Sequence, residues 1–250
     1  MGNQEITWLL QEKYHGVRSA NFLSDCARLE NSEPLGYIIG QVPFLHCTIT
    51  LNSRPLIPRT ETEYWVEQAL KVIDAAEAAQ ETPVRILDLC AGSGAIGIAV
   101  AAATATTHIT FGEIEARHLP TITENREHNH IDPKRTHIIA SDLFANITGT
   151  YDFILTNPPY IDPSIDRTEW SVKNFEPHTA LYGGQAGMEI ISRIIREAPG
   201  YLSAQGQLWM EHEPEQIPAI TTLAGEAFTM VTHPDQYKIP RFSILTMAQY

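Results

Sequence analysis

The sequence has few cysteines and no long apolar run, and each shortage excludes a class of protein. Cys26, Cys47 and Cys90 lie far apart without a C-x-x-C pair, which argues against a zinc knuckle or a disulfide framework. His128 and His130 lie close together, but a pair of histidines needs further ligands to hold a metal. No apolar run is long enough to cross a bilayer, and the start of the chain has no basic and apolar leader. We therefore expect a cytoplasmic protein with no metal and no membrane partner.

Basic residues are also scarce. The 250 residues include 17 Lys and Arg against 30 Asp and Glu, which gives a net charge of −13. Tight binding to nucleic acid needs Lys and Arg to replace the counterions of the phosphates, so we expect no direct nucleic-acid partner. Hydrophobic residues make up 43% of the chain, as in an ordinary globular protein. The length predicts one catalytic domain with a short extension, and we expect a monomer.

The first part of the chain has its own patterns. Residues 4–14 and 18–30 carry the apolar stripes of two short helices, so residues 1–33 are predicted to form a small helical cap. The run Tyr37-Ile38-Ile39 and the alternating residues after it, interrupted by glycine and proline, predict a β-hairpin or extended linker over residues 34–60.

Residues 61–250 are predicted to form the main domain, in which strands alternate with helices. The predicted strands of the alternating part are 84–89, 109–113, 136–141, 151–156 and 206–212. Such alternation implies βαβ units, and therefore a parallel sheet with helices on both faces. Residues 228–233 and 241–247 are joined without a helix, which predicts an antiparallel hairpin at the edge. The expected fold is α/β, with a mostly parallel seven-stranded sheet and a C-terminal antiparallel hairpin.

A glycine-rich loop follows the first strand of this domain. The loop contains the pattern G-x-G-x-x-G within the sequence Asp88-Leu89-Cys90-Ala91-Gly92-Ser93-Gly94-Ala95-Ile96-Gly97. A dinucleotide-binding site therefore has to be considered. Asp88 favours another ligand, because a carboxylate at the strand end repels a pyrophosphate but suits the positively charged end of S-adenosylmethionine.

Two more acidic residues end the next two strands. Glu113 lies about 20 residues beyond the loop glycines, where an acidic side chain can accept hydrogen bonds from both ribose hydroxyls. Asp142 is interpreted either as a contact to adenine or as a helix N-cap. Because ligands of open α/β sheets lie at the carboxyl ends of the strands, Asp88, Glu113 and Asp142 are predicted to line one crevice.

The turn Asn157-Pro158-Pro159-Tyr160, directly after a strand, is the strongest signal in the sequence. Successive prolines stiffen the chain and have no N–H, which leaves the side-chain oxygen of Asn157 and the carbonyl oxygen of Pro158 as acceptors. Those two oxygens can take both hydrogens of an NH₂ group, and Tyr160 offers a face for the planar group. A plain Pro-Pro turn is the structural alternative.

This turn suits methyl transfer to an amide or amine nitrogen. The lone pair of an amide nitrogen is delocalised, so catalysis must hold the nitrogen in line with the methyl group and stabilise positive charge on it. Two aimed acceptors do both. A general base is not required, because a methylated amide cation gives its proton to water.

These residues resemble the release factor glutamine methyltransferase family, whose members methylate the glutamine of the Gly-Gly-Gln motif in peptide chain release factors. The resemblance extends to residues 34–40, 56–63 and 175–187. It implies a Rossmann-like class I methyltransferase fold, S-adenosylmethionine as cofactor with S-adenosylhomocysteine as product, and release factors as protein substrates.

The resemblance and the strand-end pattern together predict the site residues. The predicted cofactor contacts are Asp88, Cys90, Ala91, Gly92, Ser93, Gly94, Glu113, Asp142, Leu143 and Asn157. The predicted substrate contacts are Asn157, Pro158, Pro159, Tyr160 and Arg59, with Asn157, Pro158 and Tyr160 as the catalytic group. Glu211 also matches a family position.

The chain departs from the family pattern in three places: Cys90 replaces the first loop glycine, Thr60 stands where proline is usual, and the cap is shorter than the family's N-terminal bundle. Three other functions stay open, namely a nucleic-acid amino-methyltransferase, a ribosomal-protein glutamine methyltransferase and a non-catalytic nucleotide-binding module. Residues 160–180 hold only Arg167 and Lys173 against four acidic residues, which disfavours the first. Gly183-Gly184-Gln185 spells the substrate motif but is interpreted as a loop.

Overall fold

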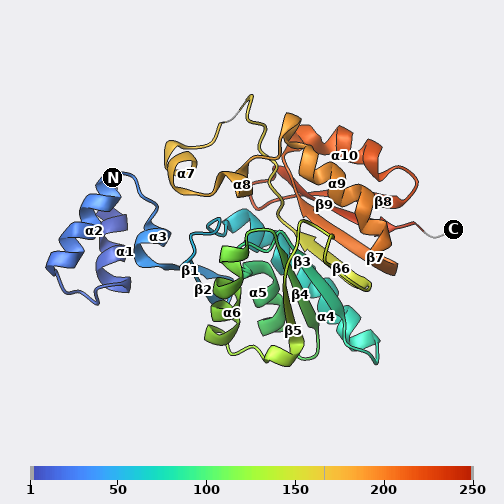
Figure 1. The fold of residues 1–250 in the computed structure, drawn as a ribbon, viewed down its shortest axis with the longest axis horizontal. Helices are drawn as coiled ribbons and strands as arrows, with labels where there is room; N and C mark the ends of the chain where they lie inside the picture. The colour runs from blue at the N-terminus through green and yellow to red at the C-terminus, as the bar shows by residue number, and fades with distance from the viewer. Residues whose placement is uncertain (1–2, 166, 249–250) are drawn as a thin grey trace.

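A seven-stranded sheet forms the centre of the folded molecule (Figure 1). The computed structural model describes residues 3–165 and 167–248, so Met1, Gly2, Asp166, Gln249 and Tyr250 of the predicted cap and main domain lie outside the described residues. The strand order is β5-β4-β3-β6-β7-β9-β8. The strands are β3 (Arg85–Leu89), β4 (His108–Glu113), β5 (Thr136–Ala140), β6 (Tyr151–Thr156), β7 (Leu202–Glu211), β8 (Phe228–Pro234) and β9 (Pro240–Met247).

The pairing of these strands confirms the predicted fold class. Strands β5, β4, β3, β6 and β7 run parallel to one another, and β9 runs antiparallel to both β7 and β8. From β3 the chain proceeds outward to β4 and β5, and then returns to place β6 on the other side of β3. The strand order therefore reverses between β3 and β6, and the carboxyl ends at this point are where open α/β sheets bind ligands.

Helices cover both faces of the sheet because successive strand residues point to opposite sides. Ile86 belongs to the core under α4 (Thr60–Ala79), α5 (Ala95–Ala103) and α6 (Leu119–His128). The next residue, Leu87, belongs to the core under α9 (Glu189–Glu197) and α10 (Ile217–Ala224). Two short helices, α7 (Trp170–Phe175) and α8 (His178–Leu181), follow β6. No helix in the described ranges is long and apolar enough to span a bilayer.

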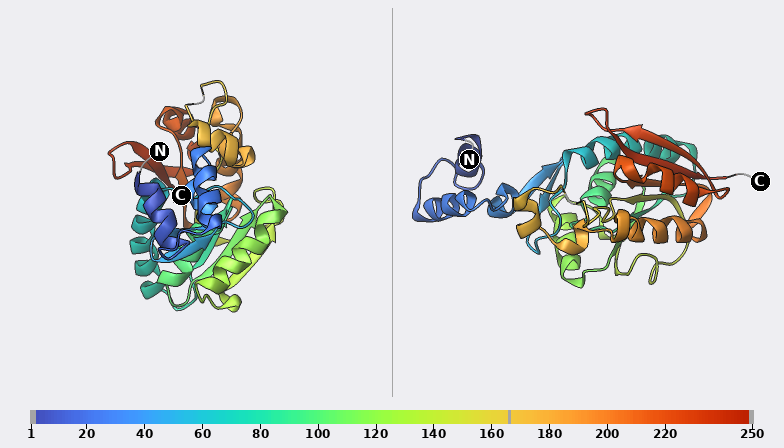
Figure 2. Two further views of the ribbon diagram at one scale, coloured as in Figure 1. Left: turned by 90° about the vertical axis from the view of Figure 1, so that its left-hand side faces the viewer. Right: turned by 90° about the horizontal axis from the view of Figure 1, so that it is seen from above.

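A small helical cap projects from one end of the molecule (Figure 2). It consists of α1 (Asn3–Glu12), α2 (Ala20–Glu30) and α3 (Leu35–Ile39). Its own core contains Leu9, Phe22, Leu29 and Ile38. The extended conformation predicted for Tyr37-Ile38-Ile39 is wrong, because these residues form most of α3. A short apolar run does not distinguish a strand from a buried helix, and here Ile38 faces the cap while Tyr37 faces the main core.

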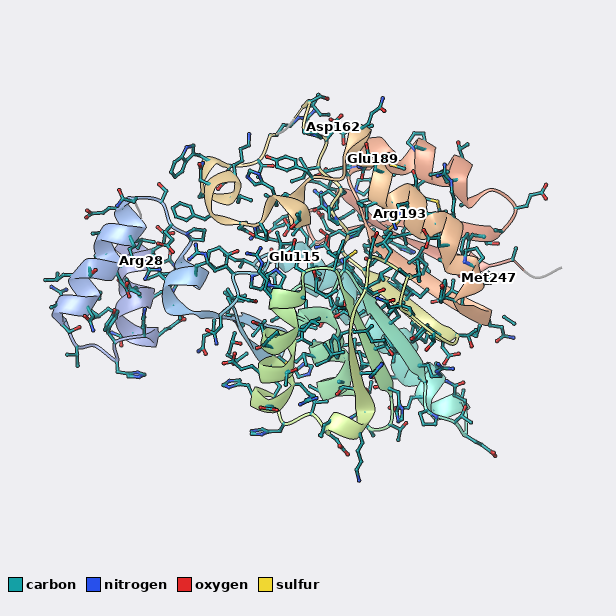
Figure 3. The ribbon with its side chains drawn as sticks, viewed as in Figure 1. Arg28, Glu115, Asp162, Glu189, Arg193 and Met247 are labelled. Carbon is teal, nitrogen blue, oxygen red and sulfur yellow. The ribbon has the colours of Figure 1, made fainter. Side chains whose placement is uncertain are left out.

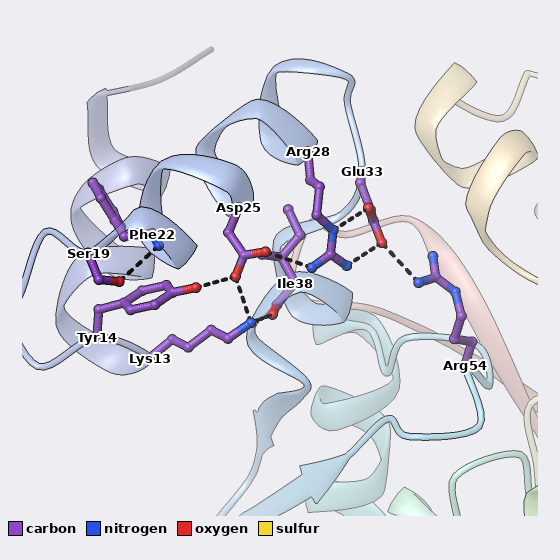
Figure 4. Close-up of polar contacts among 9 residues, drawn as sticks. All are labelled: Lys13, Tyr14, Ser19, Phe22, Asp25, Arg28, Glu33, Ile38 and Arg54. Carbon is purple, nitrogen blue, oxygen red and sulfur yellow. Dashed lines mark hydrogen bonds and ion pairs between the residues drawn. The ribbon is translucent and has the colours of Figure 1, made fainter.

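A buried carboxylate holds the cap together (Figure 4). Asp25 accepts hydrogen bonds from Lys13 Nζ at 2.7 Å, from Tyr14 Oη at 2.6 Å and from Arg28 at 2.7 Å. Burial opposes the charge of Asp25, but these bonds lower its pKa to about 2. Glu33 continues the network, since it pairs with Arg28 and with Arg54 of the following segment.

The segment after the cap contains the predicted hairpin, formed by β1 (Gln41–Phe44) and β2 (Cys47–Thr50). The hairpin packs on α6, where Asn125 accepts from the backbone N–H of Thr50 at 2.7 Å and donates to its carbonyl at 3.1 Å. Phe44 and Ile49 are fully buried in the main core. The hairpin is thereby fixed to the main domain through α6 and the main core.

Candidate active site

A cavity of about 320 Å³ lies where the strand order reverses. The ends of β3, β4, β5 and β6 contribute to its wall, and its size is within the range of small-molecule sites. Of the predicted cofactor contacts, the wall includes Cys90, Gly92, Glu113, Asp142, Leu143 and Asn157. Asp88, Ala91, Ser93 and Gly94 are not part of that wall.

Glu113 joins the end of β4 to the glycine loop. Its side chain is 5% exposed and accepts hydrogen bonds from the backbone N–H of Gly92 at 2.7 Å and of Glu115 at 2.8 Å. Burial raises the pKa of Glu113, while these backbone bonds oppose the rise. Gly92 has a φ of +56°, a conformation that favours glycine and turns its N–H toward the carboxylate. Each carboxylate oxygen keeps lone pairs for further donors.

Asp88 lies beneath the loop instead of facing the cavity. Its side chain is completely buried and accepts from the backbone N–H of Gly97 at 2.8 Å, inside the first turns of α5. Burial raises the pKa of Asp88 well above its ordinary value. Its other carboxylate oxygen has no hydrogen-bond partner among the described residues. The Asp88 carboxyl group ties the end of β3 to the start of α5 through Gly97. Direct contact of Asp88 with a cofactor stays a prediction.

Cys90 occupies a backbone conformation that suits glycine. Its φ is +60°, in the left-handed region, which agrees with the glycine that the family resemblance leads us to expect here. Its side chain forms part of the cavity wall. Burial raises the pKa of the Cys90 thiol to about 12, so it stays protonated.

We expect Cys90→Gly to stay within about 1 kcal/mol of the wild-type free energy of unfolding, because relief of strain offsets added chain entropy. Cys90→Val should lower that free energy by about 1 to 3 kcal/mol, since a β-branched residue resists positive φ. Urea unfolding of both variants measures the difference. Equal stability of the two would contradict the assigned conformation.

Asp142 forms an ion pair that sequence patterns did not reveal. Its carboxylate lies 3.0 Å from Arg193 of α9, which is labelled in Figure 3. About half of the Asp142 side chain is exposed, and it lies at the cavity wall rather than in a core. The partner comes from a helix far along the chain, so no local motif could have indicated it.

His118 is a wall residue that the sequence did not single out. Its Nδ1 lies 2.7 Å from the Ser53 hydroxyl, and its side chain is buried. Burial lowers the pKa of His118 to about 4, so the ring is neutral at pH 7. A neutral ring beside the cavity can donate or accept a hydrogen bond without adding charge.

A smaller cavity of about 200 Å³ adjoins the first one. Its wall includes Arg59, Pro158 and Tyr160, and it shares Asn157 with the larger cavity. Pro159 belongs to the wall of the larger cavity. The Asn-Pro-Pro-Tyr turn therefore separates two spaces, and Asn157 borders both. Arg59 is held by an ion pair with Glu176 at 2.6 Å.

Both ends of the turn are held by side chains from other elements. The amide nitrogen of Asn157 donates to the Thr62 hydroxyl at 3.0 Å, and the Tyr160 hydroxyl donates to Glu211 at 3.0 Å. Burial raises the pKa of both Glu211 and Tyr160. Thr62 was not recognised in the sequence, because it reaches Asn157 only through the packing of α4 on the sheet.

The glycines after α8 pack on the backbone of the turn. A side chain at Gly183 would collide with the carbonyl oxygen of Pro159, and one at Gly187 with that of Tyr160. Gln216 donates to the same Tyr160 carbonyl at 2.8 Å. Gln185 lies in a 3-10 turn between these glycines, which agrees with a loop role for Gly183-Gly184-Gln185.

Residues 3–165 and 167–248 contain no group of three His, Cys, Asp or Glu side chains placed to hold a metal ion. The cavity wall is mixed apolar and polar, and it includes the buried carboxylate of Glu113 and the amide of Asn157. This composition suits an organic ligand with hydroxyl groups.

The doubly wound sheet with an antiparallel last strand defines a class I methyltransferase fold. A methyltransferase from Pyrococcus furiosus has this fold at a TM-score of 0.58, with 14% identity, 91% of this chain and 99% of that chain covered. A 16S rRNA methyltransferase of T. thermophilus in complex with AdoMet and guanosine matches at 0.55, with 15% identity, 84% of this chain and 50% of that chain covered. The family model of the methyltransferase small domain matches residues 71–174.

The particular family follows from sequence similarity. The release factor glutamine methyltransferase of Lactococcus lactis is 32% identical over 230 residues, which are 90% of this chain and 81% of the relative. This chain belongs to the release factor glutamine methyltransferase family and is an S-adenosylmethionine-dependent methyltransferase. The cavity fits that cofactor, since Glu113 offers acceptors for hydroxyl groups beside an open glycine backbone.

Proposed function

We propose that this protein transfers the methyl group of S-adenosylmethionine to the side-chain amide nitrogen of the glutamine in the Gly-Gly-Gln motif of peptide chain release factors. The position of Asn157 between the two cavities carries the proposal, because an amide acceptor is needed where methyl donor and acceptor meet. The names of the relatives support the choice of release factors as substrate.

The larger cavity would hold the cofactor. Glu113 would accept hydrogen bonds from the ribose hydroxyls, and Asp142 with Leu143 would contact the adenine side of the ligand. Cys90, Gly92 and the rest of the loop would bring the backbone close to the ligand. S-adenosylmethionine supplies the methyl group when bound, and S-adenosylhomocysteine is the product.

The smaller cavity would hold the glutamine side chain. The Asn157 side-chain oxygen and the Pro158 carbonyl would accept the two hydrogens of its NH₂ group, so that the nitrogen faces the larger cavity. Tyr160 would pack against the planar amide, and Pro159 would keep the turn rigid. Arg59, held by Glu176, would lie at the wall of this cavity toward the substrate.

These contacts act on the charge that forms during transfer. Positive charge develops on the amide nitrogen, and two fixed oxygens stabilise that charge without reorganising. The charged product loses its proton to water, so no side chain has to act as a general base. The high pKa of Tyr160 keeps its phenol protonated, and the phenol serves to hold the turn.

We further propose that the enzyme acts as a monomer in the cytoplasm, where release factors work, without direct contact with nucleic acid. The net charge of −13 supports the last point, because a nucleic-acid enzyme would repel its substrate with such a surface.

A transfer assay with labelled S-adenosylmethionine tests the function. We expect label on a purified release factor, and none when the glutamine of its Gly-Gly-Gln motif is replaced by alanine. Label on both proteins, or on RNA instead, would contradict the proposal.

Glu113→Ala should weaken binding of S-adenosylmethionine by about 1 to 3 kcal/mol, the scale for losing hydrogen bonds to a charged group. Calorimetry measures the change, with Glu127→Ala as the control because Glu127 lies exposed at the end of α6. An unchanged affinity of the Glu113 variant would remove this residue from the cofactor site.

A further inference from the structure

Behind the catalytic turn lies a buried carboxylate that the proposed chemistry does not use. Glu211 ends β7 and is 1% exposed. One of its oxygens accepts from the Thr62 hydroxyl at 2.7 Å and from the Trp65 indole N–H at 2.8 Å. Its other oxygen accepts from the Tyr160 hydroxyl at 3.0 Å. Three donors converging on one carboxyl group suit its ionised form, which has only acceptors.

The direction of these bonds determines the orientation of Asn157. A threonine hydroxyl has one hydrogen, and Thr62 gives that hydrogen to Glu211. Toward Asn157, Thr62 can then only accept, so it must face the amide nitrogen, as it does at 3.0 Å. Because the amide nitrogen faces Thr62, the side-chain oxygen of Asn157 is turned away from Thr62, in a residue that lines both cavities.

Trp65 supports the assignment of Thr62 as the donor in its hydrogen bond with Glu211. Its indole N–H is a donor only, so the oxygen of Glu211 that it shares with Thr62 must act as an acceptor. Thr62 is 3% exposed and Trp65 is fully buried, and neither belongs to the wall of either cavity. Of the two turn residues that this group contacts, Asn157 bonds Thr62 and Tyr160 bonds Glu211, so Thr62 touches the turn through Asn157.

We propose that Thr62, backed by Glu211 and Trp65, is a positioning residue that determines which atom of the Asn157 amide faces the substrate. This rests on the proposed function of Asn157 as an acceptor for the glutamine NH₂ group. A reversed amide would present its own NH₂ to that group, donor against donor, and would also leave Thr62 facing an oxygen that it cannot bond.

Two variants of Thr62 separate orientation from packing. Thr62→Ser keeps the hydroxyl, whereas Thr62→Val keeps the shape and removes it. With a release factor at saturation, we expect Thr62→Ser to stay within about threefold of the wild-type kcat and Thr62→Val to lose about tenfold, the scale of one hydrogen bond. Affinity for S-adenosylmethionine should stay within about threefold of wild type in both.

A double-mutant cycle and a spectroscopic measurement complete the test. In an Asn157→Ala background, Thr62→Val should have no further effect, because Thr62 acts through the missing amide. NMR on the enzyme alone should show the Asn157 side-chain NH₂ protected from solvent exchange in wild type and Thr62→Ser, and unprotected in Thr62→Val.

Each result has one meaning. Equal NH₂ protection in wild type and Thr62→Val, or independent and multiplying effects of the two substitutions on kcat, would overturn the positioning role. Protection that follows the hydroxyl, in an enzyme that leaves the release factor unmethylated, would uphold the orientation of Asn157 and refute the proposed substrate instead.

Discussion

Replacing Asn157 with alanine should lower turnover of a release factor by about 10² to 10⁴-fold, the scale for removing one fixed partner of a developing charge. Asn157 borders both cavities, and its oxygen is directed away from Thr62. Its loss therefore leaves the glutamine nitrogen unaligned and its charge less stabilised. Affinity for S-adenosylmethionine should change by less than about tenfold, or roughly 1.4 kcal/mol.

Asn157→Asp should be impaired as well. An aspartate would place an oxygen against Thr62, whose hydrogen is already donated to Glu211, and would add a charge near that carboxylate. Asn52→Ala serves as the control, because Asn52 is exposed and its amide donates to Glu124 on α6. A normal rate for Asn157→Ala would mean that the turn has a structural role alone, and glutamine methylation would fail as an account.

Gly187→Ala should reduce both stability and turnover. The added Cβ would lie 1.8 Å from the carbonyl oxygen of Tyr160, and the φ of +66° at this position disfavours any side chain. We expect the free energy of unfolding to fall by about 1 to 3 kcal/mol. Since the turn itself must move, kcat should fall by about 10²-fold, the cost of misplacing a reacting group by roughly 1 Å.

The matched control is Gly200→Ala, where an added Cβ meets no atom within 4 Å. Its stability should equal or slightly exceed that of the wild type. Thermal unfolding and the release factor assay measure both variants. A Gly187→Ala enzyme with normal kcat would show that the contact with the turn does not control its geometry.

The order and type of the sheet's strands could be predicted from sequence, although β7 begins at Leu202 and not at residue 206. The alternation of strands and helices predicted the parallel part, and the lack of a helix between residues 228–233 and 241–247 predicted the antiparallel edge, which β8 and β9 form. Residues 37–39 were misassigned because a short apolar run satisfies both a strand and a buried helix. Only the packing of Ile38 in the cap distinguishes the two.

The site could be predicted only where a motif is local. The glycine loop and the Asn-Pro-Pro-Tyr turn are continuous in sequence, so their residues could be identified together. Thr62 and Arg193 reach the site from distant helices, and their contacts depend on how those helices pack. For Asp88, the sequence predicted its position at the end of a strand but not the direction of its side chain, which lies beneath the loop.

The most direct test of the account is tandem mass spectrometry of the release factor peptide that contains the Gly-Gly-Gln motif, after incubation with enzyme and S-adenosylmethionine. We predict one added methyl group on the glutamine side-chain nitrogen with the wild-type enzyme, and almost none with Asn157→Ala over the same time. A methyl group on another residue, or an unmodified glutamine with the fully folded wild-type enzyme, would contradict it.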